Sequence, residues 1–370
     1  MKSRCLLVLL TLVVLFVLPS CSNSSSSSSA GHLFVATVAD SQVTPYNINL
    51  NSGALSSNGS GVGTGTSPSA MVISPDGNTL FLAEKTSNDI RVYTINSDGT
   101  LSAASGNPQA TGLSAPAALA INPAGNFLFA ANPGNVGAPG SISVFSISKT
   151  TLTEVSGSPF PTTDNGVGPV ALTVAPSGNF IYVANQTDGT VSAYSIASSG
   201  ALSLLAAPYT AGTTPSGLAL NPDGNFLYVA NFGSNDVSSF AVCATVTSLC
   251  PVADGSLVAV SSGPFTAGIG PTVVVPHATL KFLYVLDTGG NEISEYSRGD
   301  NGSISPLNPA TIATGADPVS MVIQPQGQYL YVADNNGATV SGYHIDQTSG
   351  LLGPLTPLTT GGDPSALAAK

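Results

Sequence analysis

The chain carries very little charge and contains no tryptophan. Only 7% of its 370 residues are charged, and 8 lysines and arginines stand against 19 acidic residues, which gives a formal net charge of −11. No basic run occurs anywhere, so the phosphate attraction that supplies most affinity for nucleic acid is missing. We therefore expect no nucleic-acid partner, and we interpret the scattered acidic residues as an ordinary solvated surface.

Familiar catalytic motifs are also missing. The sequence has no G-x-S-x-G nucleophile elbow, no phosphate-binding G-K-[ST] loop and no H-E-x-x-H zinc motif. Outside the first 21 residues, no segment keeps a helical period over three turns. We predict no metal and no cofactor, and a chain built from strands.

The one long apolar run lies at the N-terminus. "MKSRCLLVLLTLVVLFVLPSC" places Lys2 and Arg4 before an apolar stretch that is short for a membrane span, which is the layout of an export signal. Its end, "LPSC", resembles the bacterial lipoprotein box, and this resemblance implies cleavage before Cys21 and a lipid on that residue. A plain secretory signal with an incidental cysteine is the alternative.

The predicted organisation follows from this start. We expect residues 1–20 to be a lipoprotein signal peptide and residues 21–31 to be the lipidated Cys21 with a serine-rich tether. The protein would then be exported and held at a lipid membrane of the cell envelope, at the outer membrane or the periplasmic face. Without Lys2 and Arg4, six cations face 19 acidic residues, so the mature net charge is −13.

Two cysteines remain, Cys243 and Cys250, in "VCATVTSLCP". In an exported chain, such a pair predicts a disulfide that pins a short hairpin. Two free thiols are the alternative. Because no histidine lies nearby, the pair makes a poor zinc site.

What the sequence does contain is a repeat. "NPDGNFLYVAN" from Asn221 reappears as "NPAGNFLFAAN" from Asn122, "APSGNFIYVAN" from Ala175 and "SPDGNTLFLAE" from Ser74. The proline of the turn recurs at intervals of 48, 53, 46, 54 and 49 residues, which is a period typical of propeller arrays. These prolines are Pro75, Pro123, Pro176, Pro222, Pro276 and Pro325.

Each repeat divides into four short strands. In the fifth blade the strands are predicted at 216–221, 226–231, 237–242 and 255–265, and the inner ones are apolar throughout. A four-stranded sheet with two apolar faces is stable only when it is stacked between similar sheets, as in a radial array.

The six turns mark six blades, and the two ends of the chain together supply a seventh. "HLFVAT" at 32–37 matches the second strand of a repeat, and "GGDPSALAAK" at the C-terminus matches a first strand. We therefore predict an all-β fold in which residues 32–370 form a seven-bladed β-propeller of four-stranded antiparallel blades. Residues 364–370 should complete the blade that residues 32–57 begin, and so close the ring.

The strand phrases resemble those of known propellers. "YVAN" at 182–185 and 228–231, "YVAD" at 331–334 and "YVLD" at 284–287 resemble the YVTN-type repeat. The wider pattern, P-x-G-x-x-[LI]-[YF] with a downstream G-x-x-P, is similar to the lactonase family, which includes propeller-type 6-phosphogluconolactonases. The resemblance implies lactone hydrolysis by histidine, arginine or carboxylate side chains at the channel mouth.

One polar residue ends the second strand of every repeat. Such residues either cap the neighbouring turn, or converge on the channel and bind a sugar, a polyol or a hard cation. The ring comprises Thr37, Glu84, Asn132, Asn185, Asn231, Asp287 and Asp334.

Catalytic candidates at the mouth are few. Glu84 and Arg91 are weak candidates, and Lys85 is the other cation beside the same loop. The remaining groups are expected in strands or on the opposite face, with structural or solvated roles. They are His32, His277, His344 and Arg298.

These observations favour a non-enzymatic interpretation. We expect a membrane-anchored propeller that acts as a ligand-binding or protein-interaction scaffold, for an unknown protein or a small polar ligand. The alternative is a 6-phosphogluconolactonase-like lactone hydrolase, and a structural envelope component is a third possibility. Recognition of a phosphate group depends on arginine or lysine side chains, and the predicted channel mouth has few of them.

Overall fold

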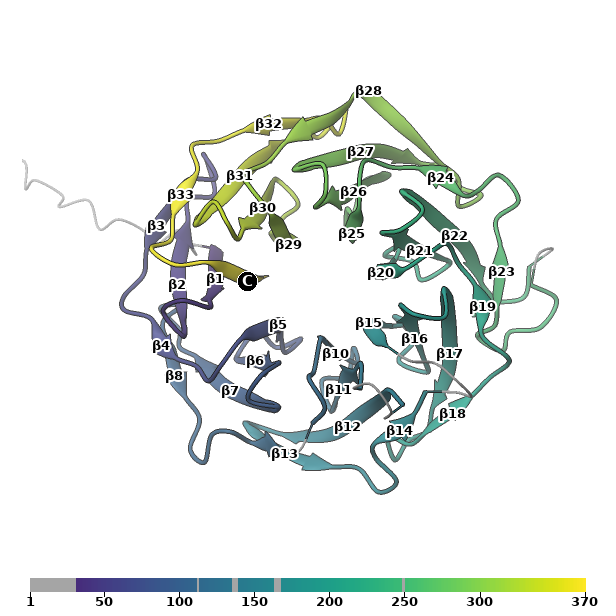
Figure 1. Ribbon diagram of the computed structural model, residues 1–370, viewed down its shortest axis with the longest axis horizontal. Coiled ribbons are helices and arrows are strands. Elements are labelled where there is room, and N and C mark those ends of the chain that lie inside the picture. The colour runs from purple at the N-terminus through teal and green to yellow at the C-terminus, as the bar shows by residue number, and fades with distance from the viewer. Residues whose placement is uncertain (1–30, 112, 135–138, 163–167, 248–249) are drawn as a thin grey trace, which may run out of the picture. The chain divides into compact units, whose positions relative to one another are not determined.

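Seven small sheets stand radially around a central axis (Figure 1). The computed structural model describes residues 31–111, 113–134, 139–162, 168–247 and 250–370, and Gly31–Lys370 forms one compact unit. The predicted signal peptide, Cys21 and the tether to residue 30 lie outside the described residues. Among the residues described, no helix is long and apolar enough to cross a membrane. The prediction of a seven-bladed all-β propeller is confirmed.

Every blade runs outward from an inner strand A, through strands B and C, to an outer strand D. The A strands of blades 1 to 7 are β34 (Pro364–Ala369), β5 (Pro68–Ile73), β10 (Ala118–Ile121), β15 (Pro169–Val174), β20 (Pro215–Leu220), β25 (Pro271–Pro276) and β29 (Pro318–Ile323). The B strands are β1 (Gly31–Thr37), β6 (Thr79–Glu84), β11 (Phe127–Asn132), β16 (Phe180–Asn185), β21 (Phe226–Asn231), β26 (Phe282–Asp287) and β30 (Tyr329–Asp334). The C strands are β2 (Gln42–Ile48), β7 (Asp89–Ile95), β12 (Ser141–Ser148), β17 (Thr190–Ile196), β22 (Asp236–Val242), β27 (Glu292–Arg298) and β31 (Thr339–Ile345).

The outer strand corrects the prediction in detail. In six blades the outer strand consists of two short pieces that both pair with strand C. In blade 5 these pieces are β23 (Leu257–Ala259) and β24 (Phe265–Thr266). The sequence analysis predicted a single strand over 255–265 there. The interruption falls on Ser-Ser-Gly-Pro, and proline has no N–H to continue a ladder. The other D strands are β3 (Leu55–Ser57) with β4 (Val62–Gly63), β8 (Leu101–Ala103) with β9 (Ala110–Thr111), β13 (Thr151–Glu154) with β14 (Phe160–Pro161), β18 (Leu202–Leu204) with β19 (Tyr209–Thr210), β28 (Ile304–Ala313), and β32 (Leu352–Pro354) with β33 (Leu358–Thr359).

The core lies between neighbouring blades. The B strands are buried on both faces, and seven apolar clusters each join two adjacent sheets, as Phe81 of blade 2 and Leu128 of blade 3 do. Burying a side chain of this size contributes about 1.5–3 kcal/mol. The tyrosine of the repeat also reaches across: the Tyr284 hydroxyl donates to the Gly350 carbonyl of the next blade at 2.7 Å. The repeated phrase is therefore a packing unit.

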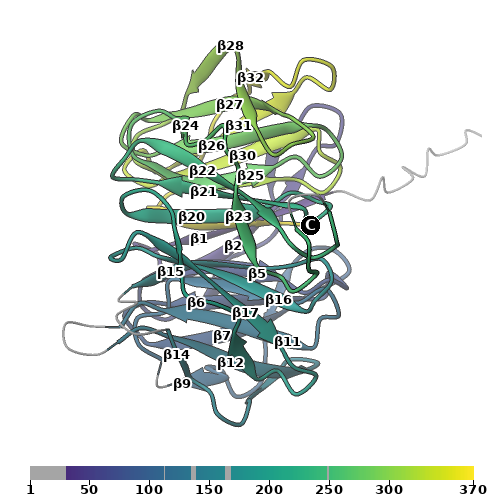
Figure 2. The ribbon, with the colours of Figure 1, turned by 90° about the vertical axis from the view of Figure 1, so that its right-hand side faces the viewer.

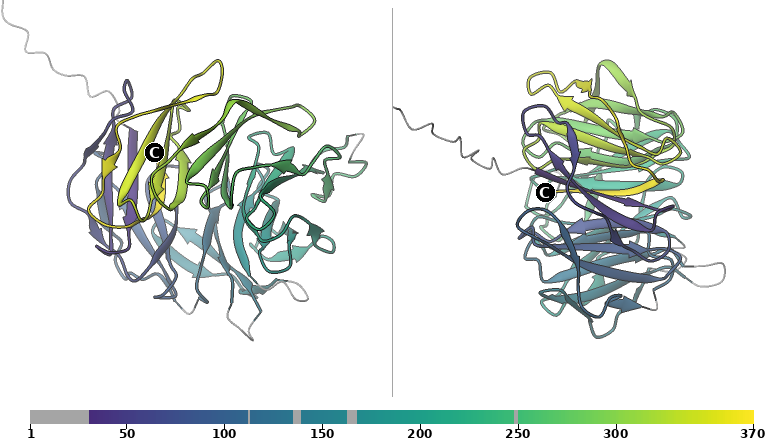
Figure 3. Two further views of the ribbon diagram at one scale, coloured as in Figure 1. Left: turned by 45° about the horizontal axis from the view of Figure 1, so that its top comes forward. Right: turned by 90° about the vertical axis from the view of Figure 1, so that its left-hand side faces the viewer.

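The chain ends close the ring, as predicted. Strand β34 pairs antiparallel with β1, and His32 and Lys370 exchange two backbone hydrogen bonds of 2.8 Å. Blade 1 is thus assembled from both ends of the described chain (Figure 3).

Because the strands alternate in direction, the connections gather on two opposite faces of the ring (Figure 2). We call the face with the A–B and C–D turns the A–B face, and the face with the B–C turns and D–A loops the B–C face. The insertion of blade 5 is a C–D turn on the A–B face, and Cys243 and Cys250 form the predicted disulfide there.

Candidate functional site

The predicted ring of polar residues exists at the B–C face, but its side chains are buried. All seven residues are at most 2% exposed: Thr37, Glu84, Asn132, Asn185, Asn231, Asp287 and Asp334. They lie inside their own blades, between strands B and C and the preceding D–A loop. In this arrangement none of them presents a polar group to a solute in the channel.

The partners of three of these side chains show what they do. The Asn231 amide oxygen accepts a hydrogen bond from the Gly212 N–H at 3.0 Å, and the Asp334 carboxylate accepts one from the Gly315 N–H at 3.1 Å. A Cβ at Gly212 would lie 2.6 Å from Cγ of Asn231, so only glycine fits. This close approach explains the glycine of the G-x-x-P phrase, and Glu84, Asn231 and Asp334 cap the preceding loop rather than the following turn.

Strand C supplies a second repeated partner. In five blades a serine hydroxyl bonds the polar residue at the end of strand B, at 2.6–2.9 Å. Blade 1 has Thr44 at this position. The five pairs are Asn132 with Ser143, Asn185 with Ser192, Asn231 with Ser238, Asp287 with Ser294, and Asp334 with Ser341.

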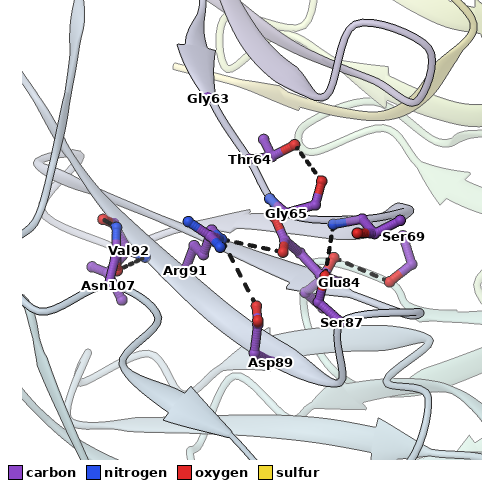
Figure 4. A network of polar contacts seen from close by, with 12 residues as sticks. Gly63, Thr64, Gly65, Ser69, Glu84, Ser87, Asp89, Arg91, Val92 and Asn107 are labelled. Atoms are coloured by element: carbon purple, nitrogen blue, oxygen red, sulfur yellow. Dashed lines mark hydrogen bonds and ion pairs between the residues drawn. The ribbon is translucent and has the colours of Figure 1, made fainter.

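Blade 2 departs from this rule. Arg91 replaces the serine, and its Nε donates to the buried Glu84 carboxylate at 3.2 Å (Figure 4). Asp89 faces Glu84 across the strand pair, with Oδ1 3.9 Å from the Arg91 Nε. The structure therefore joins the two predicted candidates, Glu84 and Arg91, and adds Asp89, which the sequence analysis missed.

The three side chains differ in exposure. That of Arg91 is 25% exposed, that of Asp89 is 8% exposed, and that of Glu84 is inaccessible. Both oxygens of Glu84 are engaged, one by the Gly65 N–H and the other by Arg91. Glu84 thus fixes the guanidinium of the partly exposed Arg91 side chain.

The electrostatics of the cluster favour proton exchange. Burial, and after it the neighbouring Glu84 carboxyl, raise the pKa of Asp89 to about 6, against the opposing effect of Arg91. Among the described residues, the buried Oδ1 of Asp89 accepts no hydrogen bond. A carboxylate with a pKa near neutrality beside a partly exposed guanidinium can take a proton from water and stabilise a developing oxyanion.

The other predicted groups lie where they were expected. His277 is buried on the A–B face, where Nδ1 accepts from the N–H groups of Thr279 and Leu280 and Nε2 contacts the Gly327 carbonyl. Arg298 donates to three carbonyls around the same turn. In the described ranges, no three His, Cys, Asp or Glu side chains are grouped to hold a metal.

The signal for blade 2 was present in the sequence. Aligning the C strands by their register would show one arginine among five serines and a threonine, at the position that contacts the end of strand B. Asp89 is less visible, because acidic residues also occupy its register in blades 5 and 6, as Asp236 and Glu292.

Comparison with known proteins supports this architecture. A family model described as "Lactonase, 7-bladed beta-propeller" matches residues 27–159, 138–261 and 254–368, which together span nearly the whole chain. The chain belongs to this lactonase family. No curated protein matches it.

Solved structures of lactonase-type propellers are similar to it in fold. The periplasmic gluconolactonase PpgL of Pseudomonas aeruginosa has 20% identity and a TM-score of 0.75, with 92% of this chain and 99% of that chain covered. A candidate 6-phosphogluconolactonase of Bacteroides fragilis has 21% identity and a TM-score of 0.75, with 94% and 99% covered. A third, from Bacteroides uniformis, has 19% identity and a TM-score of 0.76, with 92% and 100% covered.

Proposed function

We propose that this propeller hydrolyses a lactone at the cluster formed by Glu84, Asp89 and Arg91. The observation that carries the proposal is the departure of blade 2 from the repeat. In five blades a serine completes a purely structural contact, whereas here an arginine occupies that position and lies beside Asp89, at a neighbouring register position that is also acidic in blades 5 and 6. Local violations of an otherwise consistent pattern are expected at functional sites.

The chemistry assigns a role to each side chain. The Asp89 carboxylate takes a proton from water as the water oxygen bonds to the lactone carbonyl carbon. The carbonyl oxygen gains negative charge, and the Arg91 guanidinium stabilises it. The tetrahedral intermediate then breaks the ring C–O bond, and the proton passes to the leaving oxygen, which gives a hydroxy acid. Glu84 acts as a positioning residue for Arg91.

The charge of the B–C face favours a neutral sugar lactone over a phosphorylated one. Among the described residues of that face that are not buried, two cations, Lys85 and Arg91, stand against six acidic residues. Phosphate recognition requires arginine or lysine clusters, which are missing here. The acidic residues are Asp40, Asp188, Asp236, Glu292, Asp317 and Asp363.

The scaffold interpretation favoured by the sequence has less support. It depended on a mouth without catalytic groups, and blade 2 supplies three such groups in contact. Membership of the lactonase family also supports the hydrolytic alternative. A membrane-held binding role stays a prediction for the exported protein.

The test is a comparison of two substrates. We expect the purified protein to hydrolyse glucono-1,5-lactone faster than the spontaneous reaction, and to prefer it over the 6-phosphate by at least about tenfold in kcat/KM. The Arg91→Ser variant places the serine of the five other blades here and should lose the activity, and its melting temperature is measured alongside because Glu84 then loses its cationic partner. Absence of turnover on both lactones, with a folded protein, would overturn the proposal.

A further inference from the structure

A polar pocket of about 230 Å³ lies between blades 5 and 6 on the A–B face, opposite the face that holds Glu84, Asp89 and Arg91. The A–B turn of blade 5 forms one wall, and the A–B and C–D turns of blade 6 form the other. Charged and amide side chains dominate the lining, which includes Asp223, Asn225, Thr279, Lys281, Arg298 and Asp300.

Arg298 departs from the repeat. It is the last residue of β27, and its N–H donates to the Lys281 carbonyl, as the residue at the same register does in the neighbouring blades. In the six other blades this residue is aliphatic, so the fold does not require a cation here. The counterparts are Ile48, Ile95, Ile147, Ile196, Val242 and Ile345.

The corresponding groove between blades 2 and 3 provides an internal comparison. It has a volume of about 190 Å³, and Ile147 lines it at the position that Arg298 takes between blades 5 and 6. The repeat itself therefore produces a groove at this place. What distinguishes the pocket of blades 5 and 6 is the guanidinium.

The Arg298 guanidinium has donors left for a ligand. Its Nε donates to the Phe282 carbonyl, and its Nη2 donates to the carbonyls of His277 and Leu280. Of the five N–H groups of an arginine, the two on Nη1 remain. In the part of the chain that the structure describes, no carboxylate forms an ion pair with Arg298. A partly buried cation without a counter-ion favours the binding of an anion.

The fold also gives up a repeated hydrogen bond beside Arg298. In three blades the tyrosine of strand B donates to a carbonyl of the next blade. Tyr228 is the equivalent in blade 5, and it lies beside Arg298, but its buried hydroxyl donates to no acceptor among the described residues. The Gly302 carbonyl that corresponds to the missing acceptor is bonded by Ser239 instead. An arrangement that leaves a buried hydroxyl without an acceptor is better explained by binding than by stability.

We propose that this pocket binds a small carboxylic acid that carries several hydroxyl groups, and that Arg298 holds its carboxylate. Lys281 lines the same pocket and adds positive charge beside its ion pair with Asp300. The carboxylates of Asp223 and Asp300 accept hydrogen bonds from hydroxyl groups, and the Asn225 amide both donates and accepts.

The two acidic side chains of the lining also limit the charge of the ligand. A phosphate or a second carboxylate would meet them with like charge, so a monocarboxylate rich in hydroxyl groups fits best. Hydrolysis of a sugar lactone gives an acid of this class. The proposal does not depend on that activity, because the pocket and the blade 2 cluster lie on opposite faces.

The test is isothermal titration calorimetry of the full-length protein with sodium gluconate. We expect saturable binding, and at least about tenfold weaker binding of glucitol, which lacks the carboxylate, and of propanoate, which lacks the hydroxyl groups. Arg298→Ile introduces the residue of the repeat and should weaken gluconate binding at least about tenfold. Its lactonase activity should stay at the wild-type level, which separates this proposal from the function proposed for blade 2.

Matched variants locate the binding. Lys149→Met in the groove between blades 2 and 3 should leave the affinity for gluconate unchanged. Lys281→Met leaves the three hydrogen bonds of Arg298 in place and should weaken binding at least about threefold. It tests the proposal even if Arg298→Ile does not fold, which the melting temperatures show.

Three results would overturn the proposal. The first is the absence of gluconate binding to the wild type, and the second is equal affinity for glucitol or propanoate. The third is binding that is lost in Arg91→Ser and kept in Arg298→Ile, because gluconate would then occupy only the blade 2 cluster.

Discussion

At the scale of single residues, Asp89 sets the expected pH dependence of activity. Its pKa is raised to about 6 by burial and by Glu84, and it works as a base only when ionised. We expect kcat to rise with pH up to about 6 and to level off above it. The rate must be corrected for spontaneous hydrolysis, and a rate that falls over this range would contradict the role of Asp89 as base.

Glu295 provides a prediction about stability. It is buried, and desolvation raises its pKa to about 7 from an ordinary 4.5, although the Leu352 N–H opposes this by hydrogen bonding to the carboxylate. An acid with a raised pKa stabilises the fold while protonated, so this contribution is present below pH 4.5 and is lost as pH rises through 7. The difference corresponds to roughly 3 kcal/mol.

The Glu295→Gln variant removes this titration. Urea unfolding at pH 5 and pH 8 should show a smaller fall in the free energy of unfolding for the variant than for the wild type. Asp287, whose pKa burial also raises to about 7, remains and keeps part of the slope in both proteins. Parallel pH profiles of the two proteins would show that Glu295 does not titrate as described.

At the scale of elements, the D–A loop depends on its glycine. A methyl group at Gly212 would lie 2.6 Å from Cγ of Asn231, so Gly212→Ala should cost about 1–3 kcal/mol by displacing the cap. Gly63 in β4 has nothing within 4 Å of the same position, so Gly63→Ala should change stability by less than about 0.5 kcal/mol. Equal thermal stability of the two variants would show that the loop adapts freely.

The elements also show what a sequence can and cannot predict here. The B strands and A–B turns were predictable, because their apolar runs and the Asn-Pro-Asp-Gly signal at 221–224 are local features. The division of the outer strand was not, since it depends on how residues 255–266 meet β22. The buried state of Asn231 was also hidden, because the capping partner, Gly212, lies 19 residues away.

Part of the candidate site could be predicted from local sequence features, and the rest depends on contacts between strands. Glu84 and Arg91 stood out as rare charged residues near one loop, but their contact and the addition of Asp89 require the register of β6 and β7. The pKa of Asp89 depends on burial, which no local pattern encodes. The scaffold interpretation followed from examining charged residues singly rather than as a cluster.

At the scale of the whole molecule, ring closure by β34 should control stability. Deleting residues 364–370 removes the pairing of β34 with β1 and exposes the edge of β1, so we expect loss of cooperative unfolding or self-association. A circular permutant that begins at Pro68 and joins Lys370 to Gly31 through an Asn-Pro-Asp-Gly-Asn turn should keep the native melting temperature. Size-exclusion chromatography and calorimetry would compare the deletion variant with the circular permutant. A deletion variant that is monomeric and as stable as the wild type would contradict the role of β34 in closing the ring.

The whole account depends on chemistry confined to blade 2. Asp89 and Asp236 occupy the same register position in two blades, next to Glu84 and Asn231 respectively, so Asp89→Asn and Asp236→Asn form a matched pair. The decisive measurement is kcat/KM for glucono-1,5-lactone in both variants. We predict a loss of at least about a hundredfold for Asp89→Asn and wild-type activity for Asp236→Asn. Equal activity of the two variants would contradict the assignment of the site.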